Sequence, residues 1–272
     1  METELQYFNR TGFKYYKRQD AFGDVVFIHG VGLNQDMWEQ WLPIFGKNYN
    51  VLTYDLLGHN HSYNPIGPRT GLDFSNQLIE LVDHLDIKKF SLIGFSIGAV
   101  ISQIVSSLHY QRLNHVVFLH SVYQRTEAQC EAVRCRYVIT KNEGPMATVE
   151  LAIVRWFSQQ YIQENPQKID QIRKIFAKHS NDGYLKAYYF FSYAEEEMKE
   201  YPVNHVNIPA LVITGSGETG STPGMSEALA QDLPNSELII NPGHFHMAPV
   251  EHADILANQV LSFLQQYESC ES

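Results

Sequence analysis

A short apolar run that ends in Gly-Phe-Ser-Ile-Gly constrains this chain more than any other feature of its sequence. The run begins at Phe90, the pentapeptide occupies residues 94–98, and the apolar residues that follow recur with helical spacing. This order predicts a strand that turns directly into a helix. Gly94 and Gly98 suit such a corner, because strand and helix come so close there that a Cβ atom would clash. Ser96 would then lie at the tip of the corner, at the N-terminus of the helix.

The composition is typical of an ordinary soluble globular protein. The chain has 272 residues, of which 44% are hydrophobic and 18% charged, which suits one large domain or a core that carries one insertion. Its net charge of −10 and the lack of any Lys/Arg run argue against a nucleic-acid partner. No apolar run approaches the ~20 residues of a membrane helix, and the first residues do not resemble a signal peptide. We therefore expect a cytoplasmic protein without a membrane partner, and the sequence leaves its oligomeric state unknown.

The three cysteines indicate neither a disulfide framework nor a metal site. They are Cys130, Cys135 and Cys270, which are too few and too irregularly spaced for a set of disulfides. Cys130 and Cys135 also lack C-x-x-C spacing and a partnering pair of histidines. The sequence therefore predicts no metal.

Short β-rich apolar runs alternate with segments of helical pattern along much of the chain. The runs are continuous rather than alternating, as is typical of strands buried on both faces of a parallel sheet. Strands that alternate with helices predict a doubly wound, mostly parallel α/β sheet. A β-hairpin over Leu5–Phe8 and Phe13–Lys17 is expected before it. The six predicted strands are Val25–Ile28, Val51–Tyr54, Ser91–Ile93, Val116–Leu119, Leu211–Thr214 and Leu238–Ile240.

The alternation breaks between roughly residues 122 and 204. This stretch is rich in aromatic residues and shows helical patterns without a convincing strand. We interpret it as a helical cap inserted over the carboxyl ends of the strands, where open α/β sheets bind ligands. The predicted core then comprises residues 1–121 and 205–272, and the cap comprises residues 122–204. The predicted cap helices are Glu127–Lys141, Thr148–Gln163, Pro166–Lys178 and Gly183–Lys199.

A serine hydroxyl is a poor nucleophile at neutral pH and needs a base within hydrogen-bond reach. Among the twelve histidines, His246 has the best position, in a loop between the last predicted strand and the last helix. That loop lies at the carboxyl edge of the sheet, on the side where the corner presents Ser96. His244 is the alternative base, although a loop histidine bonded to backbone is the simpler interpretation of it.

An imidazole that gains a proton in each cycle needs a carboxylate to orient it and compensate its charge. Glu218 is the only carboxylate in the loop that follows the predicted Leu211–Thr214 strand. An acid after the Val116–Leu119 strand is the alternative, but the loop there starts at His120 and has no carboxylate before Glu127.

A tetrahedral intermediate also needs two hydrogen-bond donors that face its oxyanion. The backbone N–H of Ile97, directly after the serine, is one candidate. The N–H of Val31 is the other, because it lies in a glycine-rich turn at the end of the first predicted sheet strand. His29 in the same turn is interpreted as a structural residue.

Together these residues resemble the α/β-hydrolase superfamily over essentially the whole chain. The order Ser96, Glu218, His246 matches the family order of nucleophile, acid and histidine. Residues 29–32 resemble its oxyanion turn, and residues 55–62 resemble its D-x-x-G-x-G-x-S turn. Asn60 replaces a glycine of that turn, and asparagine tolerates the positive φ that the turn requires.

More narrowly, residues 121–126, 155–157 and 220–225 are similar to the branch that contains 3-oxoadipate enol-lactonases and related small carboxylesterases. In that branch the acid is normally an aspartate at the position of Glu218. Glutamate adds one methylene group and has the same carboxylate chemistry.

The resemblance implies a serine hydrolase without a cofactor, which cleaves a carboxylic ester or lactone of a small-molecule substrate through an acyl-enzyme on Ser96. Arg125, with Arg155 as a second candidate, would pair with a substrate carboxylate, and Trp156 and Tyr123 would line the pocket. Two other functions stay open. They are hydrolysis of a C–C bond in a ring-fission product and ligand sensing by a receptor of this fold.

Overall fold

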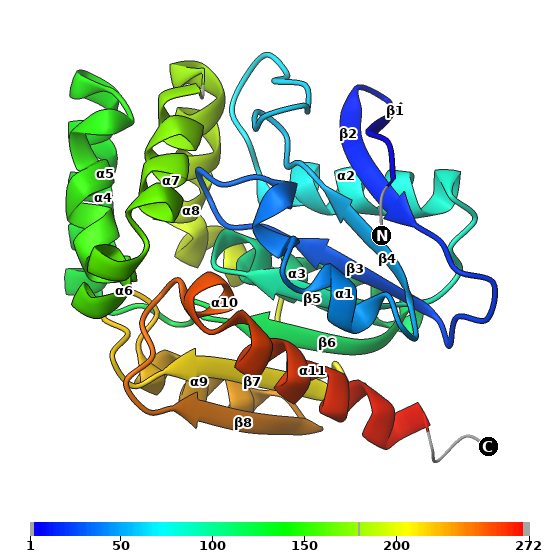
Figure 1. Cartoon of the computed structure of the whole chain (residues 1–272). Helices are drawn as coiled ribbons and strands as arrows, with labels where there is room; N and C mark the ends of the chain where they lie inside the picture. Colours follow the sequence, from blue (N-terminus) through cyan, green and yellow to red (C-terminus); the bar gives the residue numbers. More distant parts are fainter. Residues whose placement is uncertain (1–2, 179, 269–272) are drawn as a thin grey trace.

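Eight strands form a single sheet in the computed structural model, which describes residues 3–178 and 180–268 (Figure 1). Their order across the sheet is β1-β2-β4-β3-β5-β6-β7-β8, and all neighbours from β4 to β8 run parallel. The predicted doubly wound, mostly parallel sheet is confirmed. The strands are β1 (Gln6–Phe8), β2 (Thr11–Tyr16), β3 (Asp24–Ile28), β4 (Asn50–Tyr54), β5 (Phe90–Phe95), β6 (Leu113–Leu119), β7 (Ala210–Gly215) and β8 (Ser236–Asn241).

The antiparallel edge of the sheet is the predicted hairpin. Strands β1 and β2 pair around a two-residue turn, in which Asn9 and Arg10 both have positive φ (44° and 64°). Two successive residues of this kind give the turn whose twist matches that of the strands it joins. Strand β2 then pairs antiparallel with β4 and attaches the hairpin to the parallel sheet.

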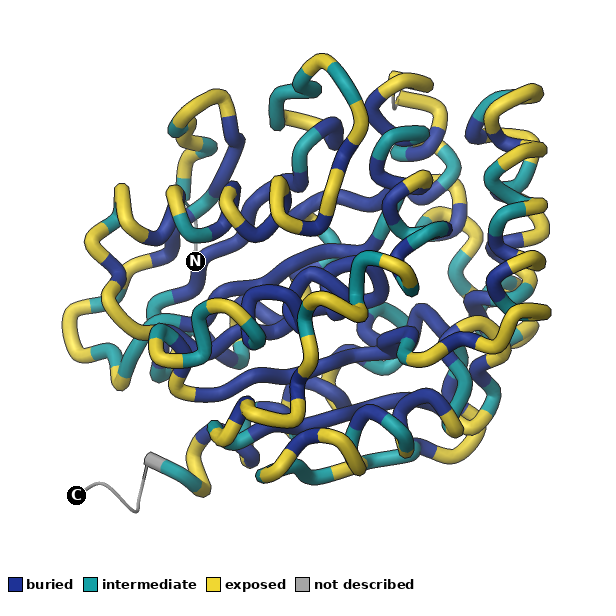
Figure 2. Tube along the Cα trace, turned by 180° about the vertical axis from the view of Figure 1, so that it is seen from behind, coloured by how far each residue is buried: buried dark blue, intermediate teal, exposed yellow. Residues whose placement is uncertain are grey.

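Side chains on successive residues of the strands enter two separate hydrophobic cores. Val25 and Phe27 of β3 face one core, and Val26 and Ile28 face the other. The first core is covered by helices α1 (Leu42–Phe45) and α11 (Ala253–Glu268), and the second by α2 (Gly71–His84), α3 (Ile97–His109) and α9 (Pro223–Asp232). Figure 2 shows the strands as the buried centre of the molecule, with the exposed positions on the outer sides of the helices. The remaining short helices of the core are η1 (Gln35–Trp38), η2 (Tyr110–Arg112) and α10 (Ala248–Glu251).

Five helices fill the stretch between β6 and β7. They lie beyond the arrowheads of the parallel strands in Figure 1, at the carboxyl edge of the sheet. The single helix predicted over Thr148–Gln163 is two helices, because Phe157 is extended and Ser158 caps a new helix through the N–H of Tyr161. The division into units at residues 122 and 204 stays a prediction. The five helices are α4 (Glu127–Glu143), α5 (Met146–Trp156), α6 (Gln159–Glu164), α7 (Pro166–Lys178) and α8 (Asn181–Met198).

A contact between two glycines joins this helical layer to the core. A Cβ atom on Gly183, in the first turn of α8, would lie 2.4 Å from the carbonyl oxygen of Gly58. Gly58 has φ +79° and belongs to the turn after β4, in which Asn60 adopts the expected positive φ of 38°. The two backbones therefore touch at a distance that only glycine permits.

Two further sequence expectations concern cysteines and membranes. Cys130 is buried and Cys135 exposed, and both are free, whereas Cys270 lies outside the described residues. Over residues 3–178 and 180–268, no helix is both long and apolar enough to cross a membrane.

The close approach of α3 to β3 generates a test of the corner. A Cβ atom on Gly98 would lie 2.5 Å from the carbonyl oxygen of Ile28, which belongs to the neighbouring strand. Alanine favours a helix over glycine by about 0.5–1 kcal/mol, so helix propensity alone predicts that Gly98→Ala stabilises the protein. We expect the opposite, a loss of about 1–3 kcal/mol in the free energy of unfolding by urea, because backbone atoms must move.

Gly23→Ala is the matched control for this prediction, since nothing lies within 4 Å of a Cβ atom there. It should leave the free energy of unfolding within about 0.5 kcal/mol of the wild type. A Gly98→Ala protein as stable as this control would contradict the close approach of α3 to β3.

Candidate active site

The parallel register of the sheet brings the ends of four strands to one level. Phe95 at the end of β5 pairs with Leu119 at the end of β6, which in turn pairs with Ile213 of β7. The ladder continues past the strands, because the N–H of Ser96 donates to the Leu119 carbonyl (3.0 Å) and the N–H of His120 to the Ile213 carbonyl (2.8 Å). Residues that directly follow neighbouring strands are therefore held side by side.

Ser96 occupies the predicted corner between β5 and α3. Its φ of 57° and ψ of −116° are uncommon for a residue with a side chain, and such strain persists only where the surrounding structure enforces it. The carbonyl of Ser96 accepts the N–H groups of Ala99 and Val100 and so begins the helix. The residue is 4% exposed and lines a cavity at the carboxyl edge of the sheet.

His246 bridges Ser96 and Glu218. Its Nε2 lies 3.2 Å from Ser96 Oγ, and its Nδ1 lies 2.5 Å from Glu218 Oε2. A carboxylate can only accept, so Nδ1 carries the proton and Nε2 of the neutral ring is free to accept the serine hydroxyl. The three side chains thus form a continuous hydrogen-bonded chain from hydroxyl to carboxylate.

The Glu218 carboxylate is buried and receives several hydrogen bonds. Oε1 accepts the N–H of Gly220 (2.7 Å), and Oε2 accepts Nδ1 of His120 (3.3 Å) in addition to that of His246. Burial alone would raise the pKa of Glu218, but the electrostatic attraction between the carboxylate and His246 and the hydrogen bonds from both histidines hold this pKa well below its ordinary value of 4.5. The group is therefore an anion at neutral pH.

His120 is a member of this cluster that sequence reasoning did not include. It follows β6 with a positive φ of 49°, and its ring packs edge-on against the His246 ring, with centroids 5.8 Å apart. Burial lowers the pKa of His120, although Glu218 counteracts this. The sequence offered one signal for His120, which is its position directly after β6. The same loop is where the alternative to Glu218 as the acid would have had to lie.

The side chains of His120, Glu218 and His246 also have the spacing of metal ligands. Among the described residues, their ligand-type atoms lie within 4.8 Å of one another. The hydrogen bonds account for this closeness, since one carboxylate oxygen accepts from both rings. We assign the cluster as a hydrogen-bond network and not as a metal centre.

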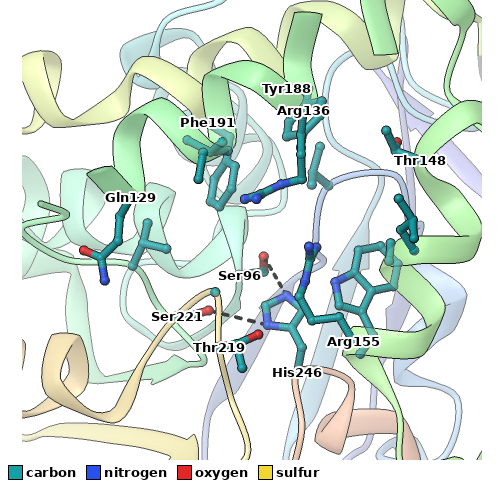
Figure 3. A pocket seen from close by; sticks show the side chains of 18 of the residues that line it. Ser96, Gln129, Arg136, Thr148, Arg155, Tyr188, Phe191, Thr219, Ser221 and His246 are labelled. Atoms are coloured by element: carbon teal, nitrogen blue, oxygen red, sulfur yellow. Dashed lines mark hydrogen bonds between the residues drawn. The ribbon is translucent and has the colours of Figure 1, made fainter. Parts of the chain in front are cut away.

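His244, the alternative base, lies away from the serine. Its ring stacks on His252 with centroids 3.9 Å apart, and burial together with the charge of His252 lowers its pKa to about 4. The structure thus brings His246 to Ser96 and leaves His244 in a separate contact. A further polar group near the site is Ser221, whose Oγ lies 3.4 Å from His246 Nδ1 (Figure 3).

The two expected oxyanion donors flank the serine. Ile97 is the first residue of α3, directly after Ser96, and Val31 lines the same cavity from the turn after β3. His29 in that turn is fully buried, and its Nε2 accepts the N–H of Leu56 (2.9 Å), which fits the structural role expected from the sequence.

A cavity of about 310 Å³ lies between the carboxyl edge of the sheet and the helical layer. Trp156 lines it, with its ring 5.9 Å from that of His246 and 5.8 Å from that of Phe176. Most of the wall is aromatic or aliphatic, as is typical of pockets for small molecules. Trp156 therefore lies where the sequence placed it, beside the serine and the base.

Arg125 and Tyr123 form contacts with other side chains and do not point freely into the space above Ser96. Arg125 lines the cavity, but its Nε pairs with the Glu195 carboxylate and its Nη2 donates to the Phe191 carbonyl (2.6 Å). Tyr123 donates its hydroxyl to Asp232 (2.6 Å) and lines a second cavity between α3, α4 and α8. Arg155, the second candidate, lines the cavity beside Ser96.

The loop that carries His246 is attached to the helical layer. The N–H of Met247 donates to the carbonyl of Trp156 (2.9 Å), at the end of α5. Next to it, the Glu251 carboxylate accepts both the backbone N–H (3.1 Å) and the hydroxyl (2.5 Å) of Ser158. The loop of His246 and one wall of the cavity are thus joined by direct hydrogen bonds.

Comparisons with known proteins identify the family. A family model described as the alpha/beta hydrolase fold matches residues 24–253. The chain belongs to the α/β-hydrolase fold family. This α/β-hydrolase is similar to 3-oxoadipate enol-lactonase 2 of Acinetobacter baylyi, at 26% identity over 243 residues that cover 89% of each chain. It is also similar to (E)-2-((N-methylformamido)methylene)succinate hydrolase of the same organism, at 30% identity over 241 residues that cover 88% of each.

A solved structure agrees with these relatives. The enol-lactonase from Burkholderia xenovorans matches this α/β-hydrolase with a TM-score of 0.87 at 25% identity, covering 96% of this chain and 100% of that one. The predicted resemblance to the enol-lactonase branch is confirmed, and the matches support a hydrolase.

His120, which donates a hydrogen bond to Glu218 alongside His246, yields a prediction about stability. His120→Ala should lower the free energy of unfolding by about 1–3 kcal/mol near neutral pH, because a buried carboxylate loses a hydrogen bond. The folded-state pKa values of Glu218 and His120 both lie below their unfolded values, so their contributions are present at higher pH and are lost as the pH falls. Urea unfolding at a series of pH values should show the difference shrinking below about pH 6.5, the ordinary pKa of His120, and further below about pH 4.5, the ordinary pKa of Glu218.

His120→Asn is the matched variant, since its amide can donate near the position of Nδ1 and asparagine tolerates the positive φ. It should recover part of the stability. A deficit in His120→Ala that does not change with pH would instead indicate lost packing or backbone strain.

The ion pair of Arg125 generates a second prediction. The Arg125 side chain is 3% exposed and the Glu195 side chain 16%, so Arg125→Met should destabilise the protein by about 2–4 kcal/mol by leaving a partly buried charge unpaired. The double variant Arg125→Met, Glu195→Met should lose less than the sum of the single variants in urea unfolding. Additive losses would show that the pair is not a stabilising contact.

Proposed function

We propose that this protein is a serine hydrolase that cleaves a carboxylic ester or lactone of a small substrate through an acyl-enzyme on Ser96. One observation carries the proposal: the buried chain of hydrogen bonds from Ser96 Oγ through His246 to Glu218. A hydroxyl, a neutral imidazole and an ionised carboxylate in this order are the parts that activate a serine for attack on a carbonyl.

In the first step Ser96 Oγ attacks the carbonyl carbon and His246 Nε2 takes the hydroxyl proton. The resulting oxyanion lies against the N–H groups of Val31 and Ile97, each of which is worth about 3–4 kcal/mol of transition-state stabilisation in comparable sites. His246 then protonates the leaving oxygen, the C–O bond breaks, and the acyl group stays on Ser96. Water, deprotonated by His246, releases the acid in a second cycle of the same steps.

Glu218 holds the imidazole and compensates its charge while it carries the extra proton. Its burial and its several donors keep it ionised, so it remains an acceptor for Nδ1 throughout the cycle. The carboxylate reaches Nδ1 at 2.5 Å, so the extra methylene of glutamate is compatible with this role.

The relatives and the cavity support the substrate class. The names of the similar proteins describe a lactonase and a hydrolase of a succinate derivative, and a cavity of about 310 Å³ suits a small molecule. The helices of residues 122–204 act in this proposal as the cap that forms the outer wall of the pocket. Assays with p-nitrophenyl acetate, an enol-lactone and a ring-fission diketone separate ester or lactone cleavage from C–C hydrolysis. Turnover of the diketone alone would contradict the proposal.

Ser96→Ala should abolish turnover of p-nitrophenyl acetate and labelling by a fluorophosphonate probe, because the attacking oxygen is removed. Mass spectrometry of the wild-type protein should locate the label on Ser96. Ser107→Ala is the control, since its hydroxyl donates to the Pro202 carbonyl (2.8 Å) and the residue does not line the cavity. Folded wild-type protein that takes no label would favour a ligand-sensing receptor instead.

Glu218→Ala should lower kcat by about 100-fold or more, because the imidazolium loses its compensating charge. Circular dichroism should show that the variant is folded at the assay temperature. Glu218→Gln, which keeps the shape without the charge, should lower kcat to a similar extent. Turnover like that of the wild type in both variants would show that another acid orients His246.

A further inference from the structure

Two arginines from different helices converge in the cavity above Ser96. Arg136 comes from α4 and Arg155 from the end of α5, and both line the cavity with the serine and His246. Figure 3 shows both guanidinium groups pointing into the space above Ser96. The geometry thus places two cationic groups beside the candidate nucleophile.

Neither guanidinium has an anionic partner within the part of the chain that the structure describes. No ion pair or side-chain hydrogen bond joins Arg136 or Arg155 to another described residue, and Nε of Arg136 is buried without an acceptor. Arg125, in contrast, lines the same cavity and is paired with Glu195. Both side chains are half-buried, and the unpaired Nε of Arg136 costs stability. No contact among the described residues gives either guanidinium a structural role.

The cavity holds an excess of positive charge in an acidic protein. Glu218 is the one acidic residue among the described residues of its wall, and its carboxylate is already occupied by three donors. Burial lowers the pKa of Arg155, and repulsion from the positive charge of Arg136 lowers it further, while Glu218 counteracts both. The chain as a whole has a net charge of −10, so this local excess runs against its overall charge.

Two negative charges on a bound molecule would pair with the two guanidinium groups and offset the repulsion between them. A planar guanidinium binds a carboxylate through two parallel hydrogen bonds, and Arg136 and Arg155 each offer such a fork from a different helix. The rest of the wall is largely apolar and would contact a carbon skeleton. We propose that Arg136 and Arg155 form a subsite for two carboxylates, so that the ester or lactone cleaved at Ser96 carries two free carboxylates besides the scissile bond.

This inference rests on the proposed hydrolase function and adds the substrate class. Hydrolysis consumes one water and releases a third carboxylate from the scissile ester, while the two carboxylates held by the arginines are unchanged. The arginines would therefore bind and orient the substrate, and Ser96, His246 and Glu218 would carry the chemistry.

Competition against p-nitrophenyl acetate hydrolysis tests the subsite. The series malonate, succinate, glutarate, adipate and pimelate should inhibit, with one chain length best, because two fixed guanidinium groups set one carboxylate spacing. The best dicarboxylate should bind about tenfold or more tightly than its monoamide, a loss typical of one charge-assisted contact. Equal inhibition by diacid and monoamide would overturn the proposal. Inorganic phosphate as the strongest inhibitor would also overturn it, in favour of a single dianion.

Variants assign the effect to the two arginines. Arg136→Gln and Arg155→Gln should each weaken the best dicarboxylate about tenfold or more and flatten the dependence on chain length. Calorimetry with each change made in Ser96→Ala protein measures this binding without turnover. Arg134→Gln is the matched control on the same helix, because Arg134 pairs with Glu127 and does not line the cavity. An unchanged chain-length profile in both test variants would contradict the subsite.

The outcomes separate the two proposals. If p-nitrophenyl acetate is hydrolysed and Ser96 is labelled but no dicarboxylate competes, the hydrolase function stands and the subsite fails. If dicarboxylates bind through the arginines and Ser96 takes no label, the subsite stands and the hydrolase proposal fails.

Discussion

The site depends on the register of the parallel ladder. Strands β5, β6, β7 and β8 end at one level, and the backbone hydrogen bonds continue past their ends into the loops. Side chains that are far apart in the chain, such as Ser96 and His246, therefore come within hydrogen-bond distance. Because each side chain in a strand alternates between the faces, a slip of one residue would move every core contact and separate the cluster.

The buried Glu218 carboxylate is the second constraint. An ionised group in this environment is tolerable only when its oxygens are fully hydrogen-bonded, and here the donors come from the loop itself and from two histidines. His120 therefore has a physical reason to follow β6. It donates to the same carboxylate oxygen as His246, and it connects the loop after β6 with the loop after β7.

The sequence could predict what depends on local pattern. Continuous apolar runs gave the strands, and the order of Ser96, Glu218 and His246 relative to those strands was enough to place them at one edge. The contacts of Arg125, Arg136 and Tyr123 could not be derived in this way. Those of the two arginines depend on how α4 and α8 are rotated against the core, and that of Tyr123 depends on where α9 ends. The pattern of α4 is only weakly amphipathic, with three buried residues in seventeen. The sequence shows that Arg125 and Arg136 are both cations, but it does not show that only Arg125 forms an ion pair with a described residue.

The hydrogen bond between Met247 and Trp156 has a mechanical consequence. It ties the segment just after the base to the end of the helix that supplies Arg155 and the aromatic wall. Ser158 and Glu251 tie the next turn in the same way. A tilt of α5 that widens the cavity would pull on the loop of His246 through these bonds. The imidazole of His246 therefore stays aligned with Ser96 Oγ only while α5 keeps its position. A position of α5 that widens the cavity and a position that aligns His246 with Ser96 would then exclude each other.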